Sequence, residues 1–229
     1  MRSLIVLLML LGLPLYGVYS GALVVPNQWN PWAPLGLDEP LNWLTRYKLG
    51  RVSREPAMCL SVLAQAKMNH QPVADRVMAP GCGFTNAVRV TRTTAHVGDA
   101  FTLSCRSALA LALWEQHVLQ PAAELHFGES VARLEHFGTY ACRPIYGREG
   151  AAQSRHSTAD AIDIAGFVLE GGRRIRVERE WGSADVDAAF LREVRDGACR
   201  VFDGVLGPDY NAAHRNHFHF ERGGWRVCR

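Results

Sequence analysis

Four histidines and the aspartate Asp163 lie in two short segments whose residue types suit a metal ion. Residues 154–163 contain His156 and Asp163, and residues 214–219 contain His214, His217 and His219. Imidazole nitrogens and carboxylate oxygens bind zinc, and two histidines with one aspartate leave a fourth position for water. The pattern therefore indicates a catalytic rather than a structural metal site. Either segment alone is a weak signal, because nine histidines make a His-x-His pair common by chance.

Alternation along β-strands decides which of these side chains can meet. In an expected strand over residues 217–221, His217 and His219 share one face of the sheet. In an expected strand over residues 161–169, Asp163 shares its face with small alanines, and isoleucines take the opposite, core-facing side. If the two strands are neighbours, a carboxylate faces two imidazoles, and His156 can join them from the preceding loop.

The elements that must position these segments form a mixed pattern of helices and strands. Periodicity and turn residues predict helices over residues 56–67, 106–119, 121–128 and 186–205, the last ended by Gly207-Pro208. Strands are predicted over residues 86–94, 100–105, 131–142, 161–169, 174–177 and 217–221, with a Gly171-Gly172 hairpin turn. Strands and helices do not alternate as βαβ units. The sequence therefore predicts an α+β fold with an antiparallel sheet flanked by helices.

Composition narrows the class of protein. The chain has 229 residues, of which 48% are hydrophobic and 21% charged, which excludes a polytopic membrane protein and a disordered chain. The net charge of +3 is too small and too dispersed to indicate nucleic-acid binding.

The N-terminal segment indicates export. Arg2 precedes an apolar run, and no further charge occurs before Asp38. Residues 1–25 fit either a cleaved signal peptide or an uncleaved anchor, and the length of the uncharged run favours an inner-membrane anchor at residues 4–25. Both interpretations place the rest of the chain in the periplasm. Residues 26–49, rich in proline and tryptophan, are expected to be a linker before a domain at residues 50–229.

Export changes the interpretation of the six cysteines. In an oxidising compartment they indicate three disulfides, and the absence of a Cys-x-x-Cys pair disfavours a zinc ribbon or a thioredoxin-like site. Six cysteines allow 15 connectivities. Among these we expect sequential pairing: Cys59–Cys82, Cys105–Cys142 and Cys199–Cys228.

The metal-site motifs resemble those of known peptidases. Residues 154–163 are similar to the Ser-x-His-x-x-Gly-x-Ala-x-Asp signature of zinc D-alanyl-D-alanine peptidases, with Ala159 in place of the glycine. The later His-x-His pair is shared by a wider superfamily that includes lysostaphin-type peptidases and the hedgehog signalling domain. The spacing His214-x-x-His217-x-His219 resembles the penicillin-insensitive murein endopeptidases.

The chain from about residue 55 to its end resembles the bacterial extensin-like C-terminal domain family. The motifs that carry this resemblance are Gly81-Cys82-Gly83, Leu103-Ser104-Cys105, Tyr140-Ala141-Cys142-Arg143, Ala161-Ile162-Asp163-Ile164-Ala165-Gly166-Phe167, Phe190-Leu191, Leu206-Gly207-Pro208-Asp209-Tyr210-Asn211 and Cys228-Arg229. These resemblances imply a hedgehog/DD-peptidase-like fold. The chain lacks the proline-rich repeats of plant extensins, so a hydroxyproline-rich structural role does not carry over.

The resemblance also assigns roles to individual residues. It implies that His156, Asp163 and His219 bind Zn²⁺. His217 is implied to act beside the metal on the attacking water or the transition state. The resemblance also implies three supporting residues. Ser154 would hold a metal ligand in place, His214 would either hold a ligand or contact the substrate, and Arg143 would bind the substrate. The general base is left open, with Glu221 near enough only if its strand continues.

The implied activity is hydrolysis of a peptide bond in peptidoglycan, in a D-amino-acid stem or cross-link. The alternative is a non-catalytic module of the same fold that binds or organises the cell wall, because a fold does not by itself fix a function.

Overall fold

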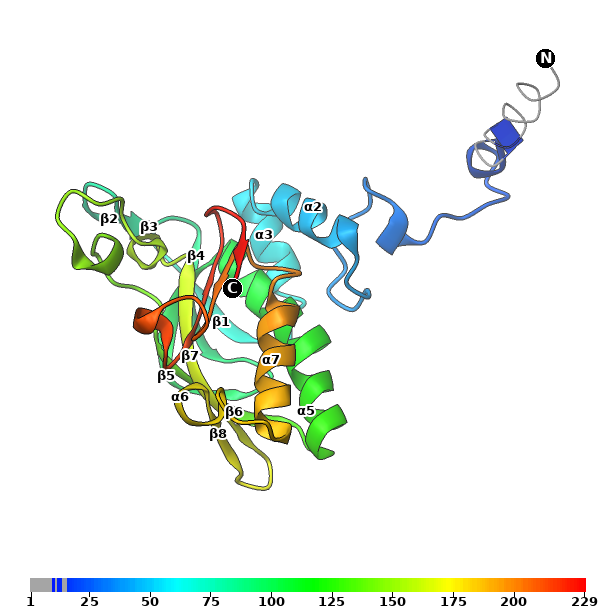
Figure 1. The fold of residues 1–229 in the computed structure, drawn as a ribbon. Coiled ribbons are helices and arrows are strands. Elements are labelled where there is room, and N and C mark those ends of the chain that lie inside the picture. Colours follow the sequence, from blue (N-terminus) through cyan, green and yellow to red (C-terminus); the bar gives the residue numbers. More distant parts are fainter. Residues whose placement is uncertain (1–9, 11, 14–15) are drawn as a thin grey trace, which may run out of the picture.

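The computed structural model describes residues 10, 12, 13 and 16–229 and is built around one mixed β-sheet (Figure 1). The strands of this sheet follow the order β1-β4-β5-β6-β7-β10-β9-β11, with β8 beside β7, and β2 and β3 form a separate hairpin. The strand bounds are β1 Asn69–Val73, β2 Arg76–Ala79, β3 Cys82–Phe84, β4 Ala87–Arg92, β5 His96–Ser104, β6 Val131–Gly138, β7 Ala161–Leu169, β8 Arg174–Arg176, β9 Gly204–Leu206, β10 Phe218–Glu221 and β11 Val227–Cys228.

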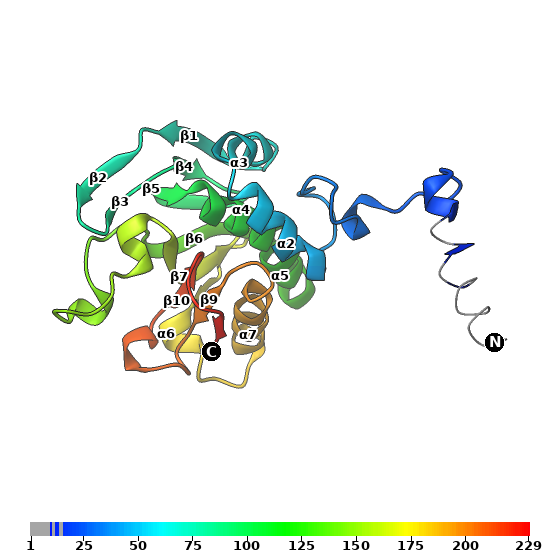
Figure 2. The same ribbon diagram turned by 90° about the horizontal axis from the view of Figure 1, so that it is seen from above.

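Helices gather on one face of the sheet in both views (Figures 1 and 2). Their bounds are α2 Trp43–Val52, α3 Pro56–Leu63, α4 Cys105–Trp114, α5 Gln120–Phe127, α6 Val177–Glu180 and α7 Val186–Ala198. A π-helical stretch, η2 Glu115–Leu119, joins α4 to α5, and the short 3₁₀ turns are η1 Asn27–Trp29, η3 Ile145–Gly147, η4 Arg155–Thr158 and η5 Ala212–His214.

The hydrophobic core lies between these helices and the sheet. Phe218 and Phe220 lie on the face of β10 that meets the helices, and both are fully buried. Trp114 packs its ring against Phe220, and its indole nitrogen donates to the Val194 carbonyl at 2.9 Å, which ties α4 to α7. Because successive strand residues point to opposite faces, this packing leaves the other face of β7 and β10 for polar side chains.

Most predicted elements are confirmed. The α+β class is correct, as is the hairpin pairing of β7 with β8. The sheet is not purely antiparallel, because β5 pairs with β6 and β9 with β11 in parallel. The predicted helix over residues 186–205 ends early at Ala198, since the chain turns so that β9 can pair with β10. The apolar residues Val201 and Val205 stay buried, but in a turn and a strand.

The packed domain begins before residue 50, where the sequence placed its start. Leu35, Leu37 and Leu41 belong to the same buried cluster as Leu49 of α2. Part of the expected linker is therefore a packed element. The expected anchor, residues 4–25, includes residues 4–9, 11, 14 and 15, which lie outside the described part of the chain. Within the described part, none of the helices has both the length and the apolar character needed to span a bilayer.

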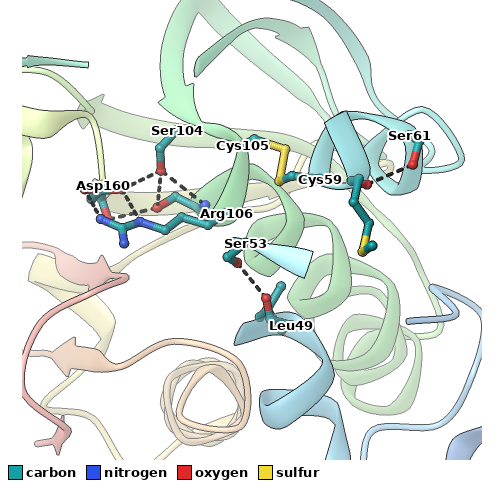
Figure 3. The surroundings of a disulfide bond; sticks show 10 residues. Leu49, Ser53, Cys59, Ser61, Ser104, Cys105, Arg106 and Asp160 are labelled. Atoms are coloured by element: carbon teal, nitrogen blue, oxygen red, sulfur yellow. Dashed lines mark hydrogen bonds and ion pairs between the residues drawn. A yellow bond between two sulfur atoms is a disulfide. The ribbon is translucent and has the colours of Figure 1, made fainter. Parts of the chain in front are cut away.

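Three disulfides cross-link the fold, but two of the predicted pairings are wrong. The pairs are Cys59–Cys105, Cys82–Cys142 and Cys199–Cys228, and only the last was predicted. Cys59 meets Cys105 because α3 packs against α4, as Figure 3 shows around this bond. Cys82 then lies on the β2–β3 hairpin, within reach of the segment that follows β6. Spacing along the chain could not reveal this packing of separate elements.

Candidate metal centre

The pairing of β7 with β10 brings the two predicted segments together. The two strands are antiparallel neighbours, and His219 lies directly opposite Asp163. Ile162 and Ile164, on either side of Asp163, are buried in the core, so the carboxylate points to the opposite face. The predicted meeting of a carboxylate with an imidazole across two neighbouring strands is therefore present.

His156 joins this pair from η4, the turn that precedes β7. The Ser154 hydroxyl accepts a hydrogen bond from the His156 backbone N–H at 3.3 Å and so caps the turn. Ala159 ends the turn in the left-handed conformation, with φ of 54°. A glycine meets this conformation without a steric cost, which is a physical reason for the glycine of the similar signature. This chain holds the turn with a buried alanine instead.

Three potential ligand atoms converge at this point. The Asp163 Oδ1 atom lies 2.9 Å from His219 Nδ1 and 3.2 Å from His156 Nε2, and the two nitrogens are 3.1 Å apart. Ligands placed tetrahedrally around zinc at its usual bond lengths lie about 3.3 Å from one another. The donor set and its spacing therefore fit a zinc ion held by three protein ligands.

Hydrogen bonds behind the two histidines fix which ring nitrogen faces the centre. The His156 Nδ1–H group donates to the Thr139 carbonyl at 3.1 Å, which leaves Nε2 free to bind a metal. The His219 Nε2–H group donates to the Glu221 carboxylate at 2.9 Å, which leaves Nδ1 as the atom that can bind a metal. A carbonyl or carboxylate behind a ligating imidazole is the usual arrangement at protein metal sites.

The strand β10 does continue through Glu221, so Glu221 shares the face of His219. Two glycines make room for its side chain: a Cβ atom on Gly204 would lie 2.4 Å from Glu221 Cγ, and one on Gly224 would lie 2.0 Å from Glu221 Oε1. Glu221 therefore lies behind His219 as an orienting group. This position does not suit a general base.

The electrostatics of the centre reflect its burial. Burial alone would raise the pKa of the Asp163 carboxyl, but hydrogen bonds from His156 and His219 hold it well below its usual range. Burial alone would lower the pKa of His219, but its bonds to Asp163 and Glu221 raise it to about 9. Two carboxylates therefore stabilise one positive charge at this ring, and a bound cation would take the place of that proton.

His217 stands beside the three ligand atoms, just before β10 begins. Its Nε2 atom is 3.5 Å from Asp163 Oδ1, and its Nδ1–H group donates to the Asn216 side-chain oxygen at 2.8 Å. His217 is not part of the convergent group of three. Burial lowers the pKa of His217, with the Asp163 carboxylate opposing the shift, so the ring is neutral at pH 7.

The other predicted site residues lie at the edge of the centre. His214 is buried, its Nδ1–H group donates to the Asn211 side-chain oxygen at 2.8 Å, and its ring lies 5.9 Å from that of His219. Burial, with the neighbouring histidines, lowers the pKa of His214 to about 4. The Arg143 side chain is exposed, and its charge contributes to the low pKa of His217.

Sequence reasoning missed three groups that hold the histidines: the Thr139 carbonyl, Asn211 and Asn216. Asn211 lies three residues before His214 and Asn216 lies directly before His217, and this closeness in the sequence is the signal that could have found them. The Thr139 carbonyl carries no such signal, because any residue supplies a main-chain oxygen.

A family model for the extensin-like protein C-terminus matches residues 57–229. The chain belongs to this family. The matched range of the extensin-like domain contains the convergent group, every residue that surrounds it and all six cysteines. Neither the curated proteins nor the solved structures include a match to the chain.

Proposed function

We propose that this extensin-like domain is a zinc-dependent hydrolase of peptide bonds in peptidoglycan. The observation that carries the proposal is the convergent group of His156, Asp163 and His219, in which both imidazoles are held by acceptors behind them. A site made only for packing has no need of two imidazoles that turn His156 Nε2 and His219 Nδ1 toward one carboxylate. Bound zinc would supply Lewis acidity, activating water and polarising the scissile carbonyl group.

His217 is the residue of this chain that would move the proton. The Asn216 side chain holds its Nδ1–H group, so the unprotonated Nε2 atom faces Asp163 and can accept a proton. Once protonated, the ring is stabilised by the nearby carboxylate and can return the proton to the leaving amine. Such a group typically contributes about 10²–10⁴ to the rate.

The surroundings leave room for an extended substrate. A cavity of about 440 Å³ is lined in part by Phe137, Ala165 and Asn216, the residue before His217, although His217 itself does not line it. The Phe137 ring packs edge-on to that of His217, and Ala165 lies two residues beyond Asp163 on the same face of β7. The exposed Arg143 would bind a carbonyl oxygen or a terminal carboxylate of the peptide.

The choice of peptidoglycan rests on export and on the resemblance of the two motifs to murein peptidases. The three disulfides support an exported protein, since such bonds persist in oxidising compartments. Export places the enzyme beside the wall polymer. Anchoring by the N-terminal segment would hold it at the inner membrane, and this too is part of the proposal.

The test measures zinc content and release of muropeptides from purified sacculi on the same full-length preparations. We expect about one zinc per chain, lost in the His156→Ala/Asp163→Ala/His219→Ala variant. His217→Ala should keep zinc and lose most of the hydrolysis, and Arg143→Ala should keep zinc with a lower kcat/KM. The exposed Arg89→Gln substitution on β4, outside the cavity that Phe137 lines, is the matched control and should change neither quantity.

Each contrary result has a definite meaning. Stoichiometric zinc in the triple variant would refute the ligand assignment. Loss of zinc from His217→Ala would make His217 a fourth ligand and the site structural. Wild-type protein that holds zinc but releases no muropeptides would favour the non-catalytic wall-binding module.

A further inference from the structure

A second cavity lies apart from the metal centre, on the far side of η4. It is enclosed by the turn between α2 and α3, the β2–β3 hairpin and the first turn of α4, and its volume is about 520 Å³. This volume lies within the range of small-molecule sites in proteins. None of His156, Asp163 and His219 lines this cavity.

Three arginines from three separate elements line this second cavity. Arg54 comes from the turn after α2, Arg76 from β2 and Arg106 from the first turn of α4. In the described part of the chain, the guanidinium groups of Arg54 and Arg76 have no ion pair and no hydrogen bond. Both side chains are exposed, so neither is needed to hold the core.

Asp160 is the one carboxylate among the described residues that line the cavity, and it already forms an ion pair with Arg106. Its oxygens accept hydrogen bonds from Arg106 Nε at 2.7 Å and Nη2 at 2.5 Å, and from the Thr158 hydroxyl at 2.7 Å (Figure 3 shows the Arg106 contacts). The Ser104 hydroxyl donates to it as well. Asp160 thus neutralises Arg106 and holds it in place. Among the described residues that line the cavity, Arg54 and Arg76 are left without an anionic partner.

The chemistry of this lining selects for anions. Guanidinium groups bind carboxylate and phosphate oxygens in pairs of parallel hydrogen bonds. Arg54 and Arg76 can therefore each bind one anionic group, and a cavity of this size can hold a ligand that carries two.

We propose that this second cavity binds a ligand that carries two anionic groups, carboxylate or phosphate. The site is independent of the metal centre and of the hydrolysis proposed there. Its specificity comes from Arg54 and Arg76, with Arg106 as a fixed third cation.

Titration calorimetry on the full-length protein in a neutral detergent tests the proposal. The probes are inorganic pyrophosphate and glutarate, each with two anionic groups, and the uncharged diamide of glutarate as a third arm. We expect pyrophosphate, glutarate or both to bind, and the diamide not to bind. The Arg54→Gln/Arg76→Gln variant should weaken that binding at least tenfold, whereas Arg133→Gln, an exposed arginine outside this cavity, should leave it unchanged. The probe that binds more tightly identifies the anionic group.

Zinc content measured on the same samples separates this site from the metal centre, because the double variant should keep the wild-type value. Equal affinity of the wild type and the double variant would overturn the proposal. So would an equal loss in Arg133→Gln, or the absence of binding of both anions at millimolar concentration.

Discussion

At the scale of single residues, Glu221 decides how well His219 can act as a ligand. Its carboxylate holds the Nε2–H group of His219 at 2.9 Å, and so directs Nδ1 to the centre. We predict that Glu221→Gln lowers zinc affinity about 10- to 100-fold, the usual effect of losing such a carboxylate. Competition with a chromogenic chelator measures this, with the exposed Glu178→Gln as control. Unchanged affinity would show that Glu221 does not orient the ligand.

A buried carboxylate far from the metal centre gives a prediction about pH. Glu115 is fully buried, its Oε2 atom accepts from the Thr94 N–H and hydroxyl groups, and its Oε1 atom has no partner. Burial raises the pKa of Glu115, with the Thr94 bonds opposing the shift. The folded state therefore binds a proton more tightly than the unfolded chain. Stability is lost as pH rises from the unfolded pKa, about 4.3, toward the folded one.

Replacement of Glu115 by glutamine should remove that loss. We expect Glu115→Gln to raise the free energy of unfolding at pH 7, because the neutral amide removes the buried charge whose desolvation raises the pKa of Glu115. Near pH 4 the variant and the wild type should be nearly equal. Urea denaturation at pH 4, 5.5 and 7 measures this, and a parallel pH dependence of both proteins would contradict it.

At this scale the sequence was informative where a side chain itself carries the signal. Strand alternation predicted that Asp163 and His219 face each other, as they do. The choice of His156 as the third member came from the resemblance to zinc peptidases, and its ring lies beside the other two. Glu221 was named only as a candidate base, since its role depends on the direction of one ring. The Thr139 carbonyl could not be found, because a backbone oxygen is invisible in a sequence.

At the scale of elements, α2 shows that a polar segment can be part of the core. Lys48 is 2% exposed, and its ammonium group reaches the Asn27 carbonyl at 2.5 Å, while Arg46 binds the Phe202 carbonyl at 2.5 Å. Charged residues among prolines and tryptophans resemble a solvated tether in a sequence. Here their apolar stems and charged ends fasten the segment to chain that is distant in sequence.

The packing of α2 can be measured. Leu49 is fully buried in the core cluster, so Leu49→Ala should lower the free energy of unfolding by about 2–5 kcal/mol. Tyr47→Ala on the exposed side of the same helix is the control, and should cost less than about 1 kcal/mol. Similar small effects of the two substitutions would mean that α2 does not contribute to the stability of the domain.

Local signals located the other elements well, and their ends less well. Gly128 ends α5 in the left-handed conformation, as its place after the predicted helix suggested. The predicted end of the helix over residues 186–205 was wrong. Val201 and Val205 keep a helical spacing, but they lie in a turn and in β9. Periodicity reports which residues are buried. It does not report whether the chain between them stays helical.

At the scale of the whole molecule, the fold class was predictable and the pairing of distant parts was not. Mixed helices and hairpins without βαβ units gave the α+β class. The parallel pairing of β5 with β6, and the contact of α3 with α4, depend on how separate segments pack around Trp114 and its neighbours. The same contact decides the Cys59–Cys105 disulfide, which is why sequential pairing failed there.

The disulfide pattern has a consequence for the order in which the chain matures. The Cys59–Cys105 and Cys82–Cys142 bonds interleave, so each closes across one cysteine of the other. If the chain is exported N-terminus first, in keeping with the proposed function, Cys59 and Cys82 reach the oxidising compartment before Cys105. The first pair available is then a mismatched one, which later thiol–disulfide exchange would correct.

Maturation should accordingly depend on a disulfide isomerase as well as on an oxidant. Trapping thiols early in export, followed by non-reducing peptide mapping, should show Cys59 joined to Cys82 and then its replacement by the final pairs. Cells without the isomerase should accumulate the mismatched form, and a Cys82→Ser/Cys142→Ser variant should mature there as quickly as in cells that have the isomerase. Direct appearance of Cys59–Cys105 with no earlier species would mean that the helices pack before the thiols are oxidised.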